Sequence, residues 1–168
     1  MTSRTLGRGA VIVTTIAAAM TFSSQVFAQT PPPLKLSGLI HDYTASLDSF
    51  GPWQVVGHWV LTVNTASGKV DFLASFNMVR AENPTRMSHT HHMQVSDGLV
   101  TTLAGGYRVS GTPTITLNGS LAGFTGSPVD IEITGGTALS YANVTIRFGG
   151  AAAAHFGSEL KGVVTYQP

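Results

Sequence analysis

The stretch from residue 53 to residue 78, WQVVGHWVLTVNTASGKVDFLASFNM, decides the fold class. Its first part alternates between two kinds of side chain. One face would carry Trp53, Val55, Gly57, Trp59, Leu61 and Val63, and the other Gln54, His58, Thr62 and Asn64. A period of two residues is that of a β-strand, because successive side chains point to opposite faces. The pattern therefore predicts a strand with one apolar face and one polar face.

The second part of the same stretch predicts the partner of this strand. Residues 65–68, TASG, have the composition of a turn, and the chain then resumes the alternation with Val70, Phe72, Ala74, Phe76 and Met78 on one face. Two alternating runs joined by a short glycine-containing loop indicate a β-hairpin. Both strands of this hairpin would bury their apolar faces against the same core.

The rest of the chain contains similar alternating runs, separated by turn residues at regular spacing. Further strands are predicted at residues 88–95, 107–117, 129–134, 141–148 and 162–166, separated by Gly, Pro, Asn and Asp. One segment, GAAAAHF at 150–156, is rich in alanine and has high helix propensity. Its short length and flanking glycines leave helix and loop both open. The chain is therefore expected to be all-β, with about eight strands.

Such a chain can form a sandwich or a barrel. We favour a single antiparallel barrel of the lipocalin or allene-oxide-cyclase kind, with the sandwich as second choice, because closure removes exposed strand edges. Few charges are available to protect such edges here, since charged residues make up 10% of the chain. An outer-membrane barrel is a weaker alternative, because several predicted strands are shorter than 9–11 residues and aromatic residues are only 8%.

The N-terminus has the three parts of a secretory signal peptide. Arg4 and Arg8 precede an uncharged apolar run at residues 10–22, and Val26-Phe27-Ala28 supplies small residues before a cut. We therefore expect residues 1–28 to be a cleaved signal peptide, residues 29–33 (QTPPP) a proline-rich spacer, and residues 34–168 a single all-β domain. The apolar run is thirteen residues long, too short for a membrane span of about 20. The expected location is secreted or periplasmic, with no transmembrane segment after cleavage.

Composition excludes some partners of such a domain. The chain has nine Lys and Arg against eight Asp and Glu, and two of the nine leave with the signal, so the remainder is slightly acidic. A nucleic-acid partner needs a basic surface and is excluded. The chain has no cysteine, so no disulfide can stabilise it. Its low charge and 43% hydrophobic content also fit association into a homo-oligomer.

The run His89-Thr90-His91-His92 stands out from this background. If residues 88–95 form a strand, His89 and His91 share its apolar face with Met93 and Val95. Two imidazoles in a His-x-His pair are spaced to bind one ion when a neighbouring element adds a ligand. The candidates for that third ligand are His58 and His155, and either Asp97 or Glu159 would add a carboxylate. The candidate metal ligands are His89, His91, His92, His58 and His155, for copper or zinc, with the Met93 thioether favouring copper.

Three functions remain open from the sequence. The leading one is a secreted β-barrel binding protein whose histidine-lined site takes a transition metal or a small apolar molecule. The second is a cyclase- or isomerase-like enzyme that uses the barrel interior, with His91 or His58 as the acid–base group. The third is a structural or surface-association protein. No nucleophile motif of the Gly-x-Ser-x-Gly type is present.

Overall fold

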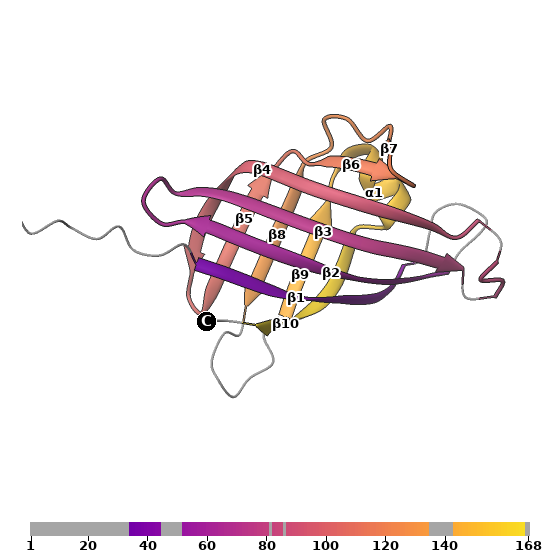
Figure 1. The fold of residues 1–168 in the computed structure, drawn as a ribbon, viewed down its shortest axis with the longest axis horizontal. Helices are drawn as coiled ribbons and strands as arrows, with labels where there is room; N and C mark the ends of the chain where they lie inside the picture. Colours follow the sequence, from indigo (N-terminus) through magenta and orange to yellow (C-terminus); the bar gives the residue numbers. More distant parts are fainter. Residues whose placement is uncertain (1–33, 45–51, 81, 86, 135–142, 167–168) are drawn as a thin grey trace, which may run out of the picture.

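The structure is a computed structural model that describes residues 34–44, 52–80, 82–85, 87–134 and 143–166 (Figure 1). The expected signal peptide and spacer, residues 1–33, lie outside the described residues. In chain order the elements are β1 (Leu34–Thr44), β2 (Trp53–Asn64), β3 (Lys69–Arg80), β4 (His89–Leu103), β5 (Gly106–Gly111), β6 (Thr114–Leu117), β7 (Ser120–Leu121), β8 (Val129–Thr134), β9 (Asn143–Phe148), α1 (Gly150–Phe156) and β10 (Glu159–Tyr166).

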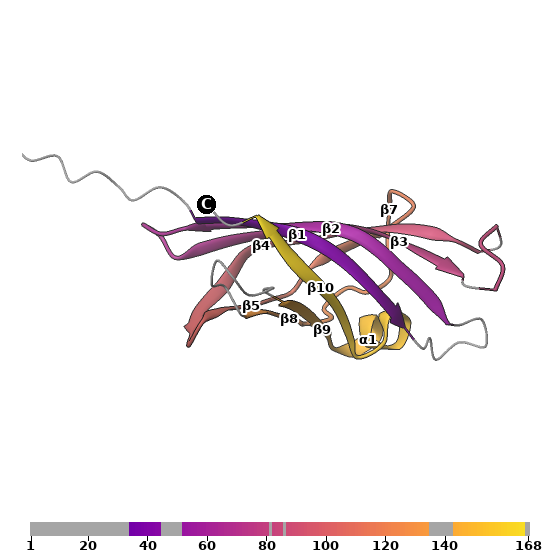
Figure 2. The ribbon, with the colours of Figure 1, turned by 90° about the horizontal axis from the view of Figure 1, so that it is seen from below.

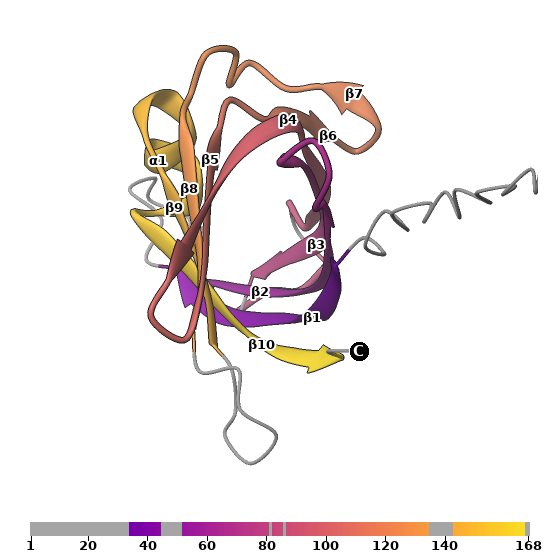
Figure 3. The ribbon, with the colours of Figure 1, turned by 90° about the vertical axis from the view of Figure 1, so that its left-hand side faces the viewer.

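Eight antiparallel strands close into a barrel. Their order is β3-β2-β1-β10-β9-β8-β5-β4, and pairing of β3 with β4 completes the ring, which Figure 3 shows end-on. The short hairpin of β6 and β7 continues from β4 outside this ring. The expectation of an all-β antiparallel barrel is confirmed, and the sandwich is not formed.

The barrel interior is packed with the apolar faces that the alternation predicted. The largest fully buried side chains include Trp59, Phe72, Phe76 and Phe156. Trp59 stacks on Phe72 with ring centroids 5.9 Å apart. Gly38 on the neighbouring strand β1 pairs with Trp59. A Cβ atom at position 38 would lie 1.8 Å from the carbonyl oxygen of Val163. A larger residue at position 38 would therefore collide with the backbone of β10.

One predicted strand is wrong in extent. Residues 107–117 were expected to be one strand, but they form β5 and β6 on either side of Pro113. β5 pairs with the later part of β4 and with β8, whereas β6 pairs with the beginning of β4. Proline has no N–H to donate to a ladder, so the pairing with β4 is interrupted around Pro113, and the pairing with β8 ends before it. β4 correspondingly extends to Leu103, well beyond the expected residue 95, and its two halves pair with different strands.

The alanine-rich segment forms helix α1, and this short helix packs against one end of the barrel. Figure 2 shows it beside β9 and β10, near the end at which β1 finishes and β2 begins. Its side chains Ala152 and Phe156 are buried, and the Phe156 ring contacts those of Phe76, Phe124 and Phe148. Phe156 therefore anchors α1 in the core. Among the described residues, no helix has the length and apolar character needed to cross a membrane.

Candidate metal centre

Strand β4 supplies two histidines to the interior at this same end of the barrel. His89 and His91 alternate with the outward-facing residues of β4, as the sequence pattern predicted. His91 is completely buried and His89 half-buried. Their ring centroids lie 4.8 Å apart, with the ring planes nearly perpendicular.

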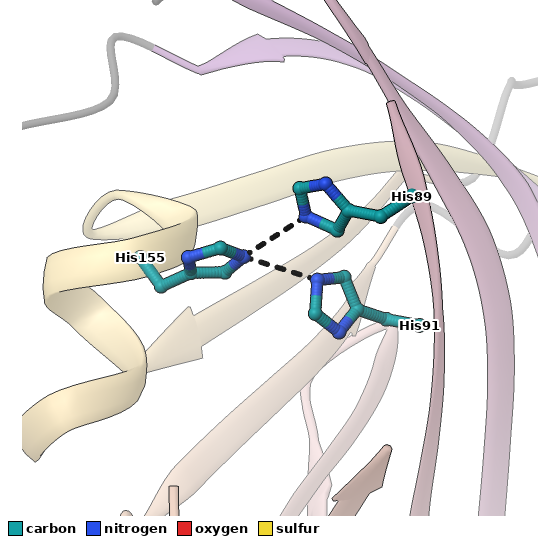
Figure 4. Close-up of side chains that lie close together, drawn as sticks. All are labelled: His89, His91 and His155. Atoms are coloured by element: carbon teal, nitrogen blue, oxygen red, sulfur yellow. Dashed lines mark hydrogen bonds between the residues drawn. The ribbon is translucent and has the colours of Figure 1, made fainter. Parts of the chain in front are cut away.

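Helix α1 supplies the third histidine. The Nε2 atom of His155 lies 3.0 Å from Nε2 of His91 and 3.2 Å from Nε2 of His89 (Figure 4). One nitrogen from each residue falls in a group whose members all lie within 4.8 Å of one another. These three residues, here called the histidine triad, could hold a metal ion. Of the two histidines proposed as third partner, the structure brings His155 to the pair.

Hydrogen bonds to backbone oxygens fix the orientation of both β4 histidines. Nδ1 of His89 lies 2.8 Å from the carbonyl oxygen of Met87, and Nδ1 of His91 lies 2.8 Å from that of Thr116. A carbonyl oxygen can only accept, so each Nδ1 must carry the proton. In the neutral rings each Nε2 then presents a lone pair toward His155. This is the tautomer that a metal ligand needs.

Burial keeps His91 in its neutral form. Its ring lies among Phe76, Phe124 and Phe156, with centroid distances of 5.7, 6.2 and 4.8 Å. The pKa of His91 is lowered from 6.5 to about 3, mainly by desolvation in this apolar setting and to a smaller extent by the nearby His89, His155 and His92. The hydrogen bond to Thr116 opposes the shift without cancelling it. His91 therefore keeps its lone pair over the whole neutral range.

The triad opens on one side to a pocket of about 340 Å³. Its walls are Trp53, Met87, Ser88, His89, Leu117, Asn118 and His155. Trp53 contacts the edge of His89, with centroids 5.2 Å apart. His91 is absent from this lining and lies behind the other two histidines. The triad therefore has a buried side and an accessible side.

Backbone strain concentrates around this pocket. Of three non-glycine residues with positive φ in the part of the chain that the structure describes, Met87 (64°) and Asn118 (48°) both line it. This conformation is unusual for a residue as large as methionine, and such strain clusters at functional sites. The carbonyl of Met87 accepts from His89, and the Asn118 side chain accepts from the backbone N–H of Thr90. Both strained residues thus hold the beginning of β4.

His58 and His92 do not join the triad. Both are exposed on the outer wall of the barrel, where they line a separate groove of about 350 Å³ over β2, β3, β4 and β6. Strand alternation is the reason, because His92 is adjacent to His91, and His58 to the inward-facing Trp59. The two suggested carboxylates also lie elsewhere: Asp97 pairs with Lys69, and Glu159 with Lys161 and Arg147. Met93 is buried on the inner face of β4.

Several contributors to the site were not anticipated from the sequence. They are Met87 and Thr116, which act through backbone oxygens, and Phe124 and Phe156, which enclose His91. A carbonyl group leaves no trace in residue identity, so the first two had no sequence signal. Phe156 had one, because it follows His155 directly in a segment with helix propensity.

Comparison of the chain with protein-family models, with curated proteins and with solved structures found no match. The function of the histidine triad is therefore inferred from its geometry alone.

Proposed function

We propose that this barrel binds one divalent transition-metal ion, zinc(II) or copper(II), through the Nε2 atoms of His89, His91 and His155. The observation that carries the proposal is the convergence of three imidazole nitrogens at the buried end of a pocket. His155 can supply only one Nε2 proton, whereas His89 and His91 both present acceptors to it. Two full hydrogen bonds are impossible in the neutral triad, whereas an ion would engage all three nitrogens.

The separations of the nitrogens fit this proposal. Zinc–nitrogen bonds of about 2.0–2.1 Å in a tetrahedron place two ligand nitrogens about 3.3–3.4 Å apart. Two pairs in the triad are separated by 3.0 and 3.2 Å. The remaining pair lies within 4.8 Å. His89 and His155 are only half-buried, so their rings have room to close this gap around an ion.

The ligand set favours zinc or copper over harder cations. Imidazole suits these two metals, while magnesium and calcium prefer oxygen ligands. Three neutral protein ligands with a fourth position facing a pocket also form the ligand pattern of open zinc sites. The Nδ1–carbonyl hydrogen bonds are the outer contacts that usually accompany metal-bound histidines.

The acid–base enzyme alternative receives less support. A general base works best when its pKa is near the working pH, and the pKa of His91 is about 3. His58 lies exposed on the outer wall, away from the barrel interior. Neither histidine is therefore well suited to proton transfer inside the barrel.

Calorimetry on the chelator-treated protein, purified without a polyhistidine tag, tests the proposal. One equivalent of zinc(II) or copper(II) is expected to bind, with affinity lost by about 100-fold or more in His155→Gln. His92→Ala is the matched control, because it removes an exposed imidazole next to His91 and should bind as the wild type does. Absence of saturable binding by the folded wild type would falsify the proposal, and so would equal loss in both variants.

A further inference from the structure

The charge of the proposed centre determines what else it binds. Three neutral imidazoles leave both positive charges of a divalent ion uncompensated. None of the residues that line the adjoining pocket is acidic. A partly buried charge of this size favours an anion as its remaining ligand. The accessible side of the triad is therefore a site for a negatively charged group from outside the protein.

The side chains of the pocket wall indicate the chemistry of the rest of the ligand, which is attached to the negatively charged group. Trp53 forms the inner part of the wall, while Met87 and Leu117 lie at its exposed rim, with 50% and 39% of their surface accessible. Three large apolar side chains beside one charged centre suit a ligand with an acidic head and an apolar body. The pocket volume of about 340 Å³ is at the small end of ligand sites.

The polar side chains in the wall are engaged with the protein itself. The Ser88 hydroxyl donates to the carbonyl oxygen of Pro84 at 2.6 Å. The Asn118 side-chain oxygen accepts from the backbone N–H of Thr90 at 3.0 Å. These groups hold the wall in shape, so the apolar surface is left to meet the ligand body.

We infer that the pocket beside the triad binds a small oxygen-donor anion with an apolar, ring-sized body. The head group completes the coordination of the metal, and the body packs against Trp53, Met87 and Leu117. This inference rests on the proposed metal function. It adds the class of molecule that the site accepts.

Cobalt(II) allows a spectroscopic test, because its absorption in the visible range changes when a further ligand binds to the ion. The cobalt-loaded full chain is titrated with acetohydroxamate, a small chelating anion, and with benzohydroxamate, which adds a phenyl ring. Both are expected to change the spectrum, with benzohydroxamate binding about tenfold more tightly.

The Leu117→Ala variant tests the contribution of the pocket wall to ligand binding separately from that of the metal. This rim substitution should reduce the preference for benzohydroxamate to about threefold while leaving cobalt and acetohydroxamate affinity unchanged. Leu99→Ala is the control, since Leu99 is an exposed leucine, 75% accessible, farther along β4 and outside the pocket lining. It should behave as the wild type.

The possible failures are distinguishable. If the folded protein binds neither cobalt(II) nor zinc(II) or copper(II), the metal proposal is overturned and this inference with it. If cobalt binds but neither hydroxamate changes its spectrum, the metal site stands and the open position is disproved. If both bind and Leu117→Ala keeps the full preference of the wild type, the pocket does not hold the ligand body.

Discussion

The Nε2 atoms of His91 and His155 lie 3.0 Å apart, although the two residues are 64 positions apart in the sequence. One residue belongs to barrel strand β4 and the other to helix α1, in the connection between β9 and β10. Their contact exists because barrel closure places β4 and α1 at the same end. A site of this kind should respond to metal, to pH and to local backbone changes in separable ways.

Metal binding should stabilise the fold. An ion that binds only the folded chain adds about 2.7 kcal/mol to the free energy of unfolding at 100 times its dissociation constant. Zinc(II) should therefore raise the Tm of the wild type and of His92→Ala, and leave that of His155→Gln unchanged. Thermal unfolding followed by circular dichroism measures this. The same rise in His155→Gln would place the bound ion elsewhere.

Acidification should destabilise the metal-free protein through His91. Above pH 6.5 the ring is neutral in both folded and unfolded chains. Between pH 6.5 and about 3 the His91 ring binds a proton in the unfolded chain but not in the folded chain. The free energy of unfolding therefore falls as the pH falls. The full loss is on the order of 4–5 kcal/mol.

The matching variant for this pH effect is His91→Phe, which keeps a ring among the surrounding phenylalanines and cannot titrate. Urea unfolding at several pH values should give a shallower pH dependence for this variant than for the wild type. Parallel curves for the two proteins would assign the acid sensitivity to other groups.

The strained backbone at Met87 should tolerate glycine and resist β-branched residues. Met87→Gly removes the side-chain penalty at φ 64°, so its stability should stay within about 1 kcal/mol of the wild type, with His89 still held by the carbonyl. Met87→Val should lose about 1–2 kcal/mol and weaken metal binding. Chemical denaturation and calorimetry on both variants check this. Equal stabilities would show that the backbone there relaxes freely.

Gly38 should not accept even an alanine. The added carbon would meet the carbonyl oxygen of Val163 at 1.8 Å, so β1 and β10 would have to separate. We expect Gly38→Ala to cost roughly 3 kcal/mol or more, or to prevent folding. The control is Gly123→Ala, where an added carbon meets nothing within 4 Å. A Gly38→Ala protein as stable as this control would contradict the close approach.

Most of the barrel could be predicted because strand alternation is a local property. The faces of β2 and of the beginning of β4 follow directly from the order of apolar and polar residues, and both were predicted correctly. The same alternation places His58 and His92 on the outward faces of β2 and β4, so it argues against both as members of the triad. Pro113 was also a sequence signal for the division between β5 and β6, although residues 107–117 were predicted as one strand.

Alternation could exclude His58 as the third member of the triad, but it could not show that His155 reaches His89 and His91. The position of His155 depends on which strands become neighbours when the ring closes, and the alternation says nothing about that order. His155 also lies on a seven-residue helix, where the two-residue period does not apply. The positions of the Met87 and Thr116 carbonyl oxygens depend in addition on the positive φ of Met87 and on the renewed pairing of β6 with β4 after Pro113.

The attachment of α1 has a consequence for which ion fits. The pleat of β4 fixes the backbone spacing of His89 and His91, so the separation of their Nε2 atoms can change only by rotation of their side chains. The distance from that pair to His155 is set separately, by how deeply Phe156 seats the helix among the core rings. A change of volume under Phe156 would move His155 relative to β4, and it would also act on the His91 ring, whose centroid lies 4.8 Å from that of Phe156. In the proposed metal site, core residues that do not contact the ion would thus help to set the ionic radius that fits.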